Sequence, residues 1–258
     1  MLISDKKIEI LKALARYKYI TASQVIELGI SSSLDSMRKY LTDLKNKELV
    51  KSTAYSGVIQ VNNKSKLIRY EDLYFLDKNG VHFLQKTYDL DDIKHPTNYK
   101  LNFSNDYVHR VLMVSICISF DKWRKEKDIK GSFLIDFHNQ ETLIKVDEKL
   151  TVKPDIIINF NGIYYIIEVW AGIEKEYITS KLGKLTKALA TKKISEFLSY
   201  EKIPRIINVF KDPNTMERVK QELQTDSYFE SAVSKGLFYF STFEDIKQNF
   251  DNWQNIRW

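Results

Sequence analysis

Two carboxylates in the second half of the chain, Asp155 and Glu168, stand at a spacing that could serve metal-dependent chemistry. Asn161-Gly162 lies between them and is flanked on both sides by apolar, β-rich residues. This dipeptide predicts a two-residue type I′ hairpin, because both turn positions need positive φ. If Phe160 pairs with Ile163, Asp155 lies opposite Glu168 on the same face of the sheet. The spacing therefore predicts that the two carboxylates meet.

Like charges that face each other across a β-ladder repel, since their Cβ atoms are only about 4.5–5.5 Å apart, so this pair needs a compensating cation. Mg²⁺ binds through one or two carboxylates and keeps its other positions for water and phosphate oxygen. We therefore expect Asp155 and Glu168 to bind Mg²⁺ or Mn²⁺ at a phosphodiester-cleaving site. The same register puts Lys153 on this face, where it could orient the attacking water or neutralise transition-state charge. The alternative is that Asp155 only begins a strand after Pro154 and that Glu168 pairs with a nearby lysine.

The elements around this hairpin predict a mixed sheet with helices on both faces, an α/β (α+β) fold. We expect strands at 132–137, 152–160, 163–169, 205–210 and 237–240, and helices at 105–125, 174–200, 215–223 and from Phe243 onward. The helix at 174–200 carries six lysines, of which Lys181 and Lys184 are candidates to contact DNA phosphates beside the carboxylates. The alternative is that this helix only presents a solvated charged face.

The N-terminal third predicts a helix-turn-helix. A helix over 5–17 is capped by Asp5, and a short helix runs from the N-cap Thr21 to Gly29. A third helix carries an apolar stripe of Leu34, Met37, Leu41 and Leu44. Its outward face is small, polar and basic, which is typical of a recognition helix.

Two strands, at 49–52 and 68–76, follow these helices and are joined by the polar stretch 56–66, which would form a wing. We expect Arg38, Lys39 and Lys64 to contact phosphates, Ser36 to face a base edge, and Arg69 to add positive charge to the wing. A short helix starts at 77–80. The alternatives are a small helical bundle with a solvated charged face, or a protein-docking module.

At 258 residues and 43% hydrophobic composition, the chain is long enough for two domains. Residues 90–100 lack periodicity and predict a linker, so we expect a winged helix-turn-helix DNA-binding domain at 1–95 and a nuclease-like domain at 101–258. A homodimer would match a palindromic DNA site.

Composition argues against several other classes of protein. The net charge of +6 comes from 40 basic and 34 acidic residues, a balance that tolerates a nucleic-acid partner without requiring one. The single cysteine, Cys117, lies in an apolar run, and the four histidines have no zinc-ligand spacing. No stretch approaches the ~18 apolar residues of a membrane span and the N-terminus is unlike a signal peptide, so we expect a cytoplasmic protein without a membrane partner.

Lys153-Pro154-Asp155, the hairpin and Ile167-Glu168-Val169-Trp170 together resemble the PD-(D/E)XK nuclease superfamily. The resemblance implies a restriction-endonuclease-like fold, with Asp155 and Glu168 binding a divalent metal and a lysine two residues past the glutamate assisting attack. Trp170 stands where that lysine belongs. Because the lysine can migrate to other elements in this superfamily, Lys153, Lys181 or Lys184 could substitute.

The whole layout also resembles the replication-relaxation family of plasmids and mobile elements. The matching residues are Tyr74-Phe75-Leu76 with Gly80, Val108-His109-Arg110, Pro154-Asp155, Ile167-Glu168-Val169, Gly172, Glu174 and Lys181-Leu182. This resemblance implies action on double-stranded DNA at a plasmid origin, in replication or conjugative mobilisation, alongside replication or conjugation proteins.

Two functions from different classes remain open. In the first, the protein is a Mg²⁺-dependent, relaxase-like site-specific nickase or endonuclease, which the paired carboxylates favour. In the second, it is a catalytically inactive DNA-binding adaptor or transcriptional regulator, which Trp170 favours.

Overall fold

The computed structural model describes residues 3–61, 64–90, 93, 104–136, 142–172 and 175–255. The chain divides into two compact units, Met1–Val114 and Ser115–Trp258. The first holds helices with a small sheet, and the second holds a mixed sheet flanked by helices, so the expectation of a mixed α+β protein is confirmed. No helix within the described ranges combines the length and the apolar character needed to cross a bilayer.

Three helices begin the first unit: α1 (Asp5–Tyr17), α2 (Ala22–Glu27) and α3 (Leu34–Asn46). The predicted cap of α2 is confirmed, because the Thr21 hydroxyl accepts from the Gln24 N–H while the Gln24 side chain accepts from the Thr21 N–H. The predicted cap of α1 is wrong: Ser4 is the N-cap residue, without a side-chain bond, and Asp5 is the first helical residue. Of the predicted stripe on α3, Met37, Leu41 and Leu44 are completely buried, whereas Leu34, the first residue of the helix, is half-buried.

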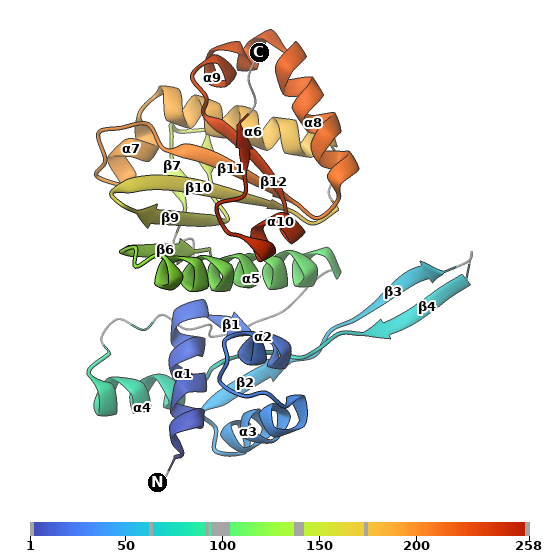
Figure 1. Ribbon diagram of the computed structural model, residues 1–258, viewed down its shortest axis with the longest axis vertical. Coiled ribbons are helices and arrows are strands. Elements are labelled where there is room, and N and C mark those ends of the chain that lie inside the picture. Colours follow the sequence, from blue (N-terminus) through green and yellow to red (C-terminus); the bar gives the residue numbers. More distant parts are fainter. Residues whose placement is uncertain are drawn as a thin grey trace. The chain divides into compact units, whose positions relative to one another are not determined.

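A three-stranded sheet in the order β1-β5-β2 completes this core, with β1 (Tyr19–Ile20), β2 (Val50–Thr53) and β5 (Leu73–Leu76) all antiparallel to their neighbours. Between β2 and β5 the chain forms a long hairpin of β3 (Ser56–Val61) and β4 (Lys64–Arg69), which projects away from the three helices (Figure 1). The predicted single strand at 68–76 is therefore wrong, since it is divided between β4 and β5. The stretch 56–66, predicted as a polar connection, instead contains β3 and the first residues of β4, and these two strands pair with each other.

Helix α4 (Lys78–Tyr88) follows β5, capped by the Asp77 carboxylate. Gly80 is required there, because a Cβ at this position would lie 2.1 Å from the Leu49 carbonyl oxygen. Of the predicted linker at 90–100, only Leu90 and Ile93 are described. The division between the two units falls further along, inside α5 (Ser104–Glu126).

The sheet of the second unit has the order β13-β12-β11-β10-β9-β6. The strands are β6 (Gly131–Ile135), β9 (Ile156–Phe160), β10 (Ile163–Trp170), β11 (Arg205–Phe210), β12 (Phe238–Thr242) and β13 (Gln254–Asn255). Strand β9 runs antiparallel to both of its neighbours, β6 and β10, whereas β10, β11 and β12 run parallel. The predicted mixed sheet is confirmed.

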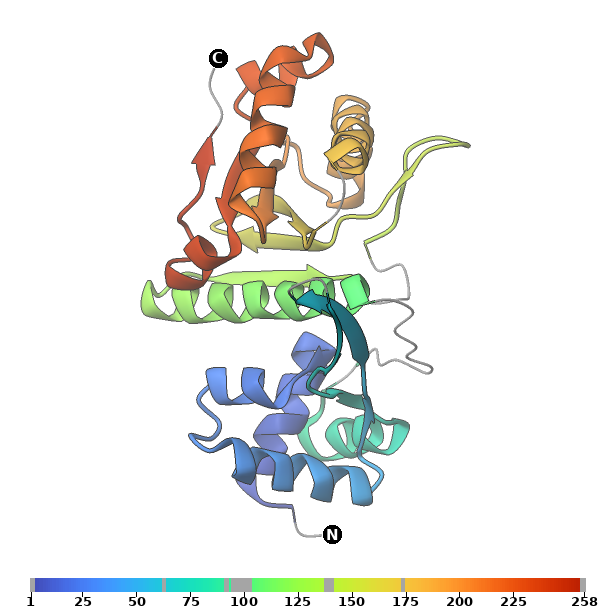
Figure 2. The ribbon, with the colours of Figure 1, turned by 90° about the vertical axis from the view of Figure 1, so that its right-hand side faces the viewer.

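Helices cover both faces of this sheet (Figure 2). Against one face lies the C-terminal part of α5, where Phe120 contacts Phe133 and Phe160. Against the other pack α6 (Lys175–Ala190), α7 (Lys193–Phe197), α8 (Pro213–Thr225) and α9 (Glu230–Ser234), whose buried apolar side chains meet those of β10, β11 and β12. A short 3₁₀ helix, η1 (Ser227–Phe229), precedes α9, and α10 (Phe243–Gln248) follows β12.

Two sequence-predicted elements are interrupted. The helix predicted at 174–200 is broken between α6 and α7, where Lys192 takes a left-handed conformation with φ of 60°. The strand predicted at 152–160 is broken at 153–155, since Pro154 cannot donate a ladder hydrogen bond. Its first residues form β8 (Thr151–Val152), which pairs instead with β7 (Ile144–Lys145).

Candidate functional site

The β9–β10 hairpin has the register that the sequence predicted. Phe160 pairs with Ile163, and the ladder continues to the pair of Ile156 and Ile167. Asn161 and Gly162 both have positive φ, 51° and 71°, as a type I′ turn requires. The next step of this register puts Asp155, just before β9, beside Glu168 in β10.

Both carboxylates are held inside the unit. Asp155 is almost fully buried, and Glu168 has no exposed surface. The Val169 N–H donates to Asp155 Oδ2 over 2.8 Å. If the ladder continued, Val169 would lie opposite Pro154. The ladder stops at Ile156, and the Asp155 carboxylate accepts the Val169 N–H in place of a backbone carbonyl.

Lys181 on α6 joins the two carboxylates. Its Nζ lies 3.1 Å from Asp155 Oδ1 and also contacts Glu168 Oε2. Burial raises the pKa of Glu168 well above its ordinary value and the Asp155 charge adds to this rise, although Lys181 opposes it. Burial also disfavours the Lys181 ammonium, but the two carboxylates outweigh that effect and raise the pKa of Lys181. Lys181 is therefore a cation at neutral pH.

Trp170 packs beside this ammonium. Its indole ring centroid is 5.4 Å from Lys181 Nζ, close enough for a cation–π contact. The indole N–H donates to Asn208 Oδ1 at 3.1 Å, and Asn208 pairs with Glu168 in the parallel β10–β11 ladder. Trp170 thus occupies the position where the PD-(D/E)XK resemblance expects lysine, and it is fully integrated into the core.

Lys153 pairs with a different acid, not with Asp155 or Glu168. Its ammonium pairs with Asp136 Oδ2 at 2.9 Å, because the strand break at Pro154 takes Lys153 out of the hairpin ladder. The lysine that contacts both carboxylates is Lys181. The sequence indicates Lys181 only as a candidate DNA contact and as one of three lysines that could replace the lysine expected at position 170.

Asp136 is a buried acid that the sequence reasoning missed. It follows β6, whose pairing of Ile135 with Ile156 puts Asp136 next to Asp155. The Asp136 N–H donates to the Asp155 carbonyl over 2.8 Å. An acid directly after the apolar run 133–135 could have been recognised in the sequence as a candidate site residue. Only the long-range pairing of β6 with β9, however, brings Asp136 beside Asp155. A row of polar side chains, Asp136, Asp155, Glu168 and Asn208, therefore crosses four neighbouring strands.

The donor set of this row fits a divalent cation in one respect. Glu168 Oε1 is buried and accepts no hydrogen bond from the described residues, so it retains a free lone pair. With Asp155 it makes two carboxylate ligands, which suffices for Mg²⁺. Within the described ranges no cluster of three or more acidic, histidine or cysteine residues gathers around one point, so the remaining ligands would have to be water or substrate.

The candidate DNA-contacting residues of the first unit lie on two elements. Arg38 and Lys39 are exposed on α3, and Lys64 and Arg69 are exposed on β4. Ser36 is half-buried in the first turn of α3, where its N–H donates to Ser33 Oγ.

A cavity of about 440 Å³ brings Arg38 and Arg69 together. Arg38 lies on α3, and Arg69 ends β4 at the base of the hairpin. The Ser23 hydroxyl of α2 donates to Glu71 Oε1 at 2.8 Å, which ties this base to the helices. The structure therefore joins the outer face of α3 to the base of the hairpin.

No protein-family model matches the chain, and no curated protein gives a significant match. The resemblances to the PD-(D/E)XK superfamily and to the replication-relaxation family therefore stay predictions.

Proposed function

We propose that the chain is a DNA-acting protein in which a winged helix-turn-helix binds double-stranded DNA and a restriction-endonuclease-like domain cuts or nicks it with a divalent metal. The observation that carries this proposal is the buried pair of Asp155 and Glu168 with Lys181 in contact with both. A fully buried carboxylate is costly, so its retention beside a second one favours a functional role over a structural one.

The first unit supports the DNA-binding part. Helices α2 and α3 follow each other as in a helix-turn-helix, and the hairpin stands where a wing would. Arg38 and Arg69 line one cavity, so guanidinium groups from the helix and from the hairpin base could contact the same stretch of DNA backbone. Lys39 and Lys64 would add phosphate contacts on either side.

The second unit supports the cleavage part. Asp155 and Glu168 would hold Mg²⁺ or Mn²⁺, which supplies a Lewis acid and an activated water. Lys181 would stabilise the negative charge that develops on the phosphate, because its ammonium already lies beside both carboxylates. The net reaction is hydrolysis: water oxygen bonds to phosphorus, the phosphodiester P–O bond breaks, and the leaving oxygen takes a proton.

A second function, an inactive DNA-binding adaptor or regulator, is favoured by a different observation. Lys181 already pairs with both carboxylates, and the fully packed Trp170 stands in place of the expected lysine. In either case we propose that the DNA is an origin of a plasmid or mobile element, bound by a homodimer with replication or conjugation proteins as partners.

A supercoiled plasmid incubated with Mg²⁺ or Mn²⁺ separates these two functions. The nuclease predicts relaxed or linear product from the wild type, with a rate that falls at least about 10–100-fold in Asp155→Ala, Glu168→Gln and Lys181→Ala. Asp251→Ala, which changes an exposed aspartate of the same unit, is the matched control and should cut normally. Intact plasmid under conditions where gel shifts show binding would rule out the nuclease and leave the adaptor.

A further inference from the structure

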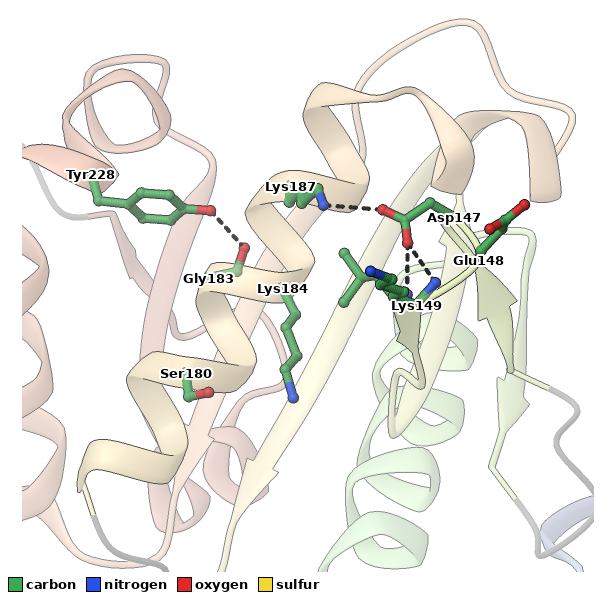
Figure 3. Close-up of a pocket in the computed structure, with 9 residues that line it drawn as sticks. Asp147, Glu148, Lys149, Ser180, Gly183, Lys184, Lys187 and Tyr228 are labelled. Carbon is green, nitrogen blue, oxygen red and sulfur yellow. Dashed lines mark hydrogen bonds and ion pairs between the residues drawn. The ribbon is translucent and has the colours of Figure 1, made fainter.

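A groove of about 670 Å³ crosses the outer face of α6 in the second unit, separate from the carboxylates. Figure 3 shows Tyr228 on one side of α6 and the β7–β8 turn, with Asp147 and Lys149, on the other. Ser180 and Gly183 form the floor between them. These are small residues, so a ligand could approach the helix closely, and the volume is in the range of small-ligand sites.

The groove offers more free positive than negative charge, two exposed lysines against the one exposed carboxylate of Glu148. Lys149 and Lys184 are exposed and have no ion pair among the described residues. Asp147, in contrast, is fully used: its Oδ1 accepts from the Lys149 and Leu150 N–H groups, and its Oδ2 pairs with Lys187 at 3.0 Å. The backbone N–H of Lys149, followed by Lys187, lowers the pKa of Asp147, so this carboxylate stays charged and fixed in the turn.

Tyr228 supplies an aromatic wall. The residue is 56% exposed, although a tyrosine is normally more than half covered when it serves only packing. Its hydroxyl donates to the Gly183 carbonyl at 3.2 Å, and its ring meets Phe229 edge-on. The ring is therefore held in place with a face open to the groove.

The same helix links the groove to the carboxylates. Ser180, Lys184 and Lys187 recur at helical spacing on the groove side of α6. Lys181, the next residue after Ser180, points instead to Asp155 and Glu168. The groove and the carboxylate pair therefore lie at the same level of α6, on different sides of the helix.

We propose that this groove binds a single-stranded DNA segment next to the scissile phosphate, with a base stacked on Tyr228 and phosphates on Lys149 and Lys184. Single strands are recognised by this combination of lysines and an open aromatic ring, whereas the base faces inside a duplex are already covered by the neighbouring base pairs. The proposal rests on the proposed function for its ligand, DNA, but it does not require cleavage.

Fluorescence anisotropy of a labelled twelve-nucleotide oligothymidylate with the full chain in EDTA tests this site. Tyr228→Ala should weaken binding at least about fivefold, the lower limit of one base–aromatic stack, while Tyr228→Phe should bind as the wild type does. Lys149→Ala/Lys184→Ala should also lower the salt dependence, by about 0.7 in the log–log slope for each phosphate that is no longer bound. The matched control is Lys125→Ala/Lys127→Ala, which removes two exposed lysines at and just beyond the end of α5.

The measurements are repeated in the Arg38→Ala/Lys39→Ala background, so that the first unit cannot mask the groove. The single-strand assignment would be overturned if thymidine monophosphate bound the wild type as tightly as the oligonucleotide does. Equal affinity for a duplex of the same length would also overturn it. So would an oligonucleotide that fails to bind, or one that binds all groove variants equally, even if the plasmid is cut. Groove-dependent binding without plasmid cleavage would instead support this site and contradict only the nuclease.

Discussion

The ammonium of Lys181 contacts the carboxylate of Glu168, which has no exposed surface. The two residues come from different elements, α6 and β10, so this contact fixes the helix to the sheet at the candidate site. Its charge also offsets the repulsion between Glu168 and Asp155. The contact therefore holds α6 against β10 and places one cation beside both carboxylates.

Removal of this ammonium should destabilise the protein. Lys181→Met leaves Glu168 buried without its cation, a change that costs about 3–5 kcal/mol for a fully buried pair. Because the Lys181 side chain is 21% exposed, water can partly replace it, and we expect the lower end, about 3 kcal/mol, in urea unfolding.

Lys184→Met is the matched control, since Lys184 is an exposed lysine one turn further along α6 and should change the unfolding free energy by less than about 0.5 kcal/mol. In the double variant Lys181→Met/Glu168→Gln part of the loss should return, because Asp155 is then the one carboxylate of the pair that has lost the ammonium, and it still accepts from the Val169 N–H. Equal destabilisation in the single and the double variant would show that packing, and not charge, explains the effect.

The hairpin turn gives a second prediction. Gly162 has φ of 71° and open space where a Cβ would lie, so Gly162→Ala should cost about 1–2 kcal/mol through backbone strain alone. Gly183 lies inside α6, where a Cβ would make only ordinary contacts, 3.6 Å to Tyr228 and 3.9 Å to Phe229. Gly183→Ala should therefore stabilise, by about 0.5–1 kcal/mol. Thermal unfolding that shifts both variants in the same direction would contradict the assignment of the strain to the turn.

The sequence predictions succeed where the interactions are local in the chain and fail where they join distant residues. Asn161 and Gly162 are adjacent, so local backbone preference is enough to set the register that pairs β9 with β10. Asp136 reaches the site only through the pairing of β6 with β9, and no short-range signal specifies that pairing. Lys181 meets Glu168 only once α6 packs on the sheet, and six lysines in one predicted helix give no means of choosing among them.

Strand breaks are the other source of error. Pro154 is visible in the sequence, but β-forming residues stand on both sides of Lys153-Pro154-Asp155 and favour one continuous strand at 152–160. The sequence therefore predicts Lys153 in the ladder, whereas its ammonium pairs with Asp136. The stretch 56–66 predicts a polar connection because seven of its eleven residues are polar or charged. The described residues of this stretch nevertheless pair along a β3–β4 ladder, from Ser56 with Arg69 to Val61 with Lys64.

The capping box of α2 predicts a local loss of stability in the first unit. Thr21→Ala removes the acceptor of the Gln24 N–H and should lower the unfolding free energy by about 1 kcal/mol. Thr42→Ala, on the exposed side of α3, is the control and should have little effect. Hydrogen exchange at the Gln24 amide locates the loss, because its protection should fall in Thr21→Ala and not in Thr42→Ala. Unchanged protection would contradict the role of the Thr21 hydroxyl.

Tyr107 predicts a stability change at alkaline pH. It lies nearly buried in a cluster with Tyr55 and Tyr70, with ring centroids 5.7 Å and 4.9 Å away. Burial, followed by the charges of Glu71 and Asp72, raises the pKa of Tyr107. Because the folded pKa of Tyr107 exceeds the unfolded value of about 10, its contribution to stability is fully present below pH 10 and is lost as the pH rises further.

Urea unfolding between pH 8 and 11 should therefore show a steeper decline in unfolding free energy for the wild type than for Tyr107→Phe, which has no hydroxyl to ionise. Lysines also titrate in this range, but they do so equally in both proteins, so parallel curves would show that the Tyr107 hydroxyl is not held neutral by its surroundings.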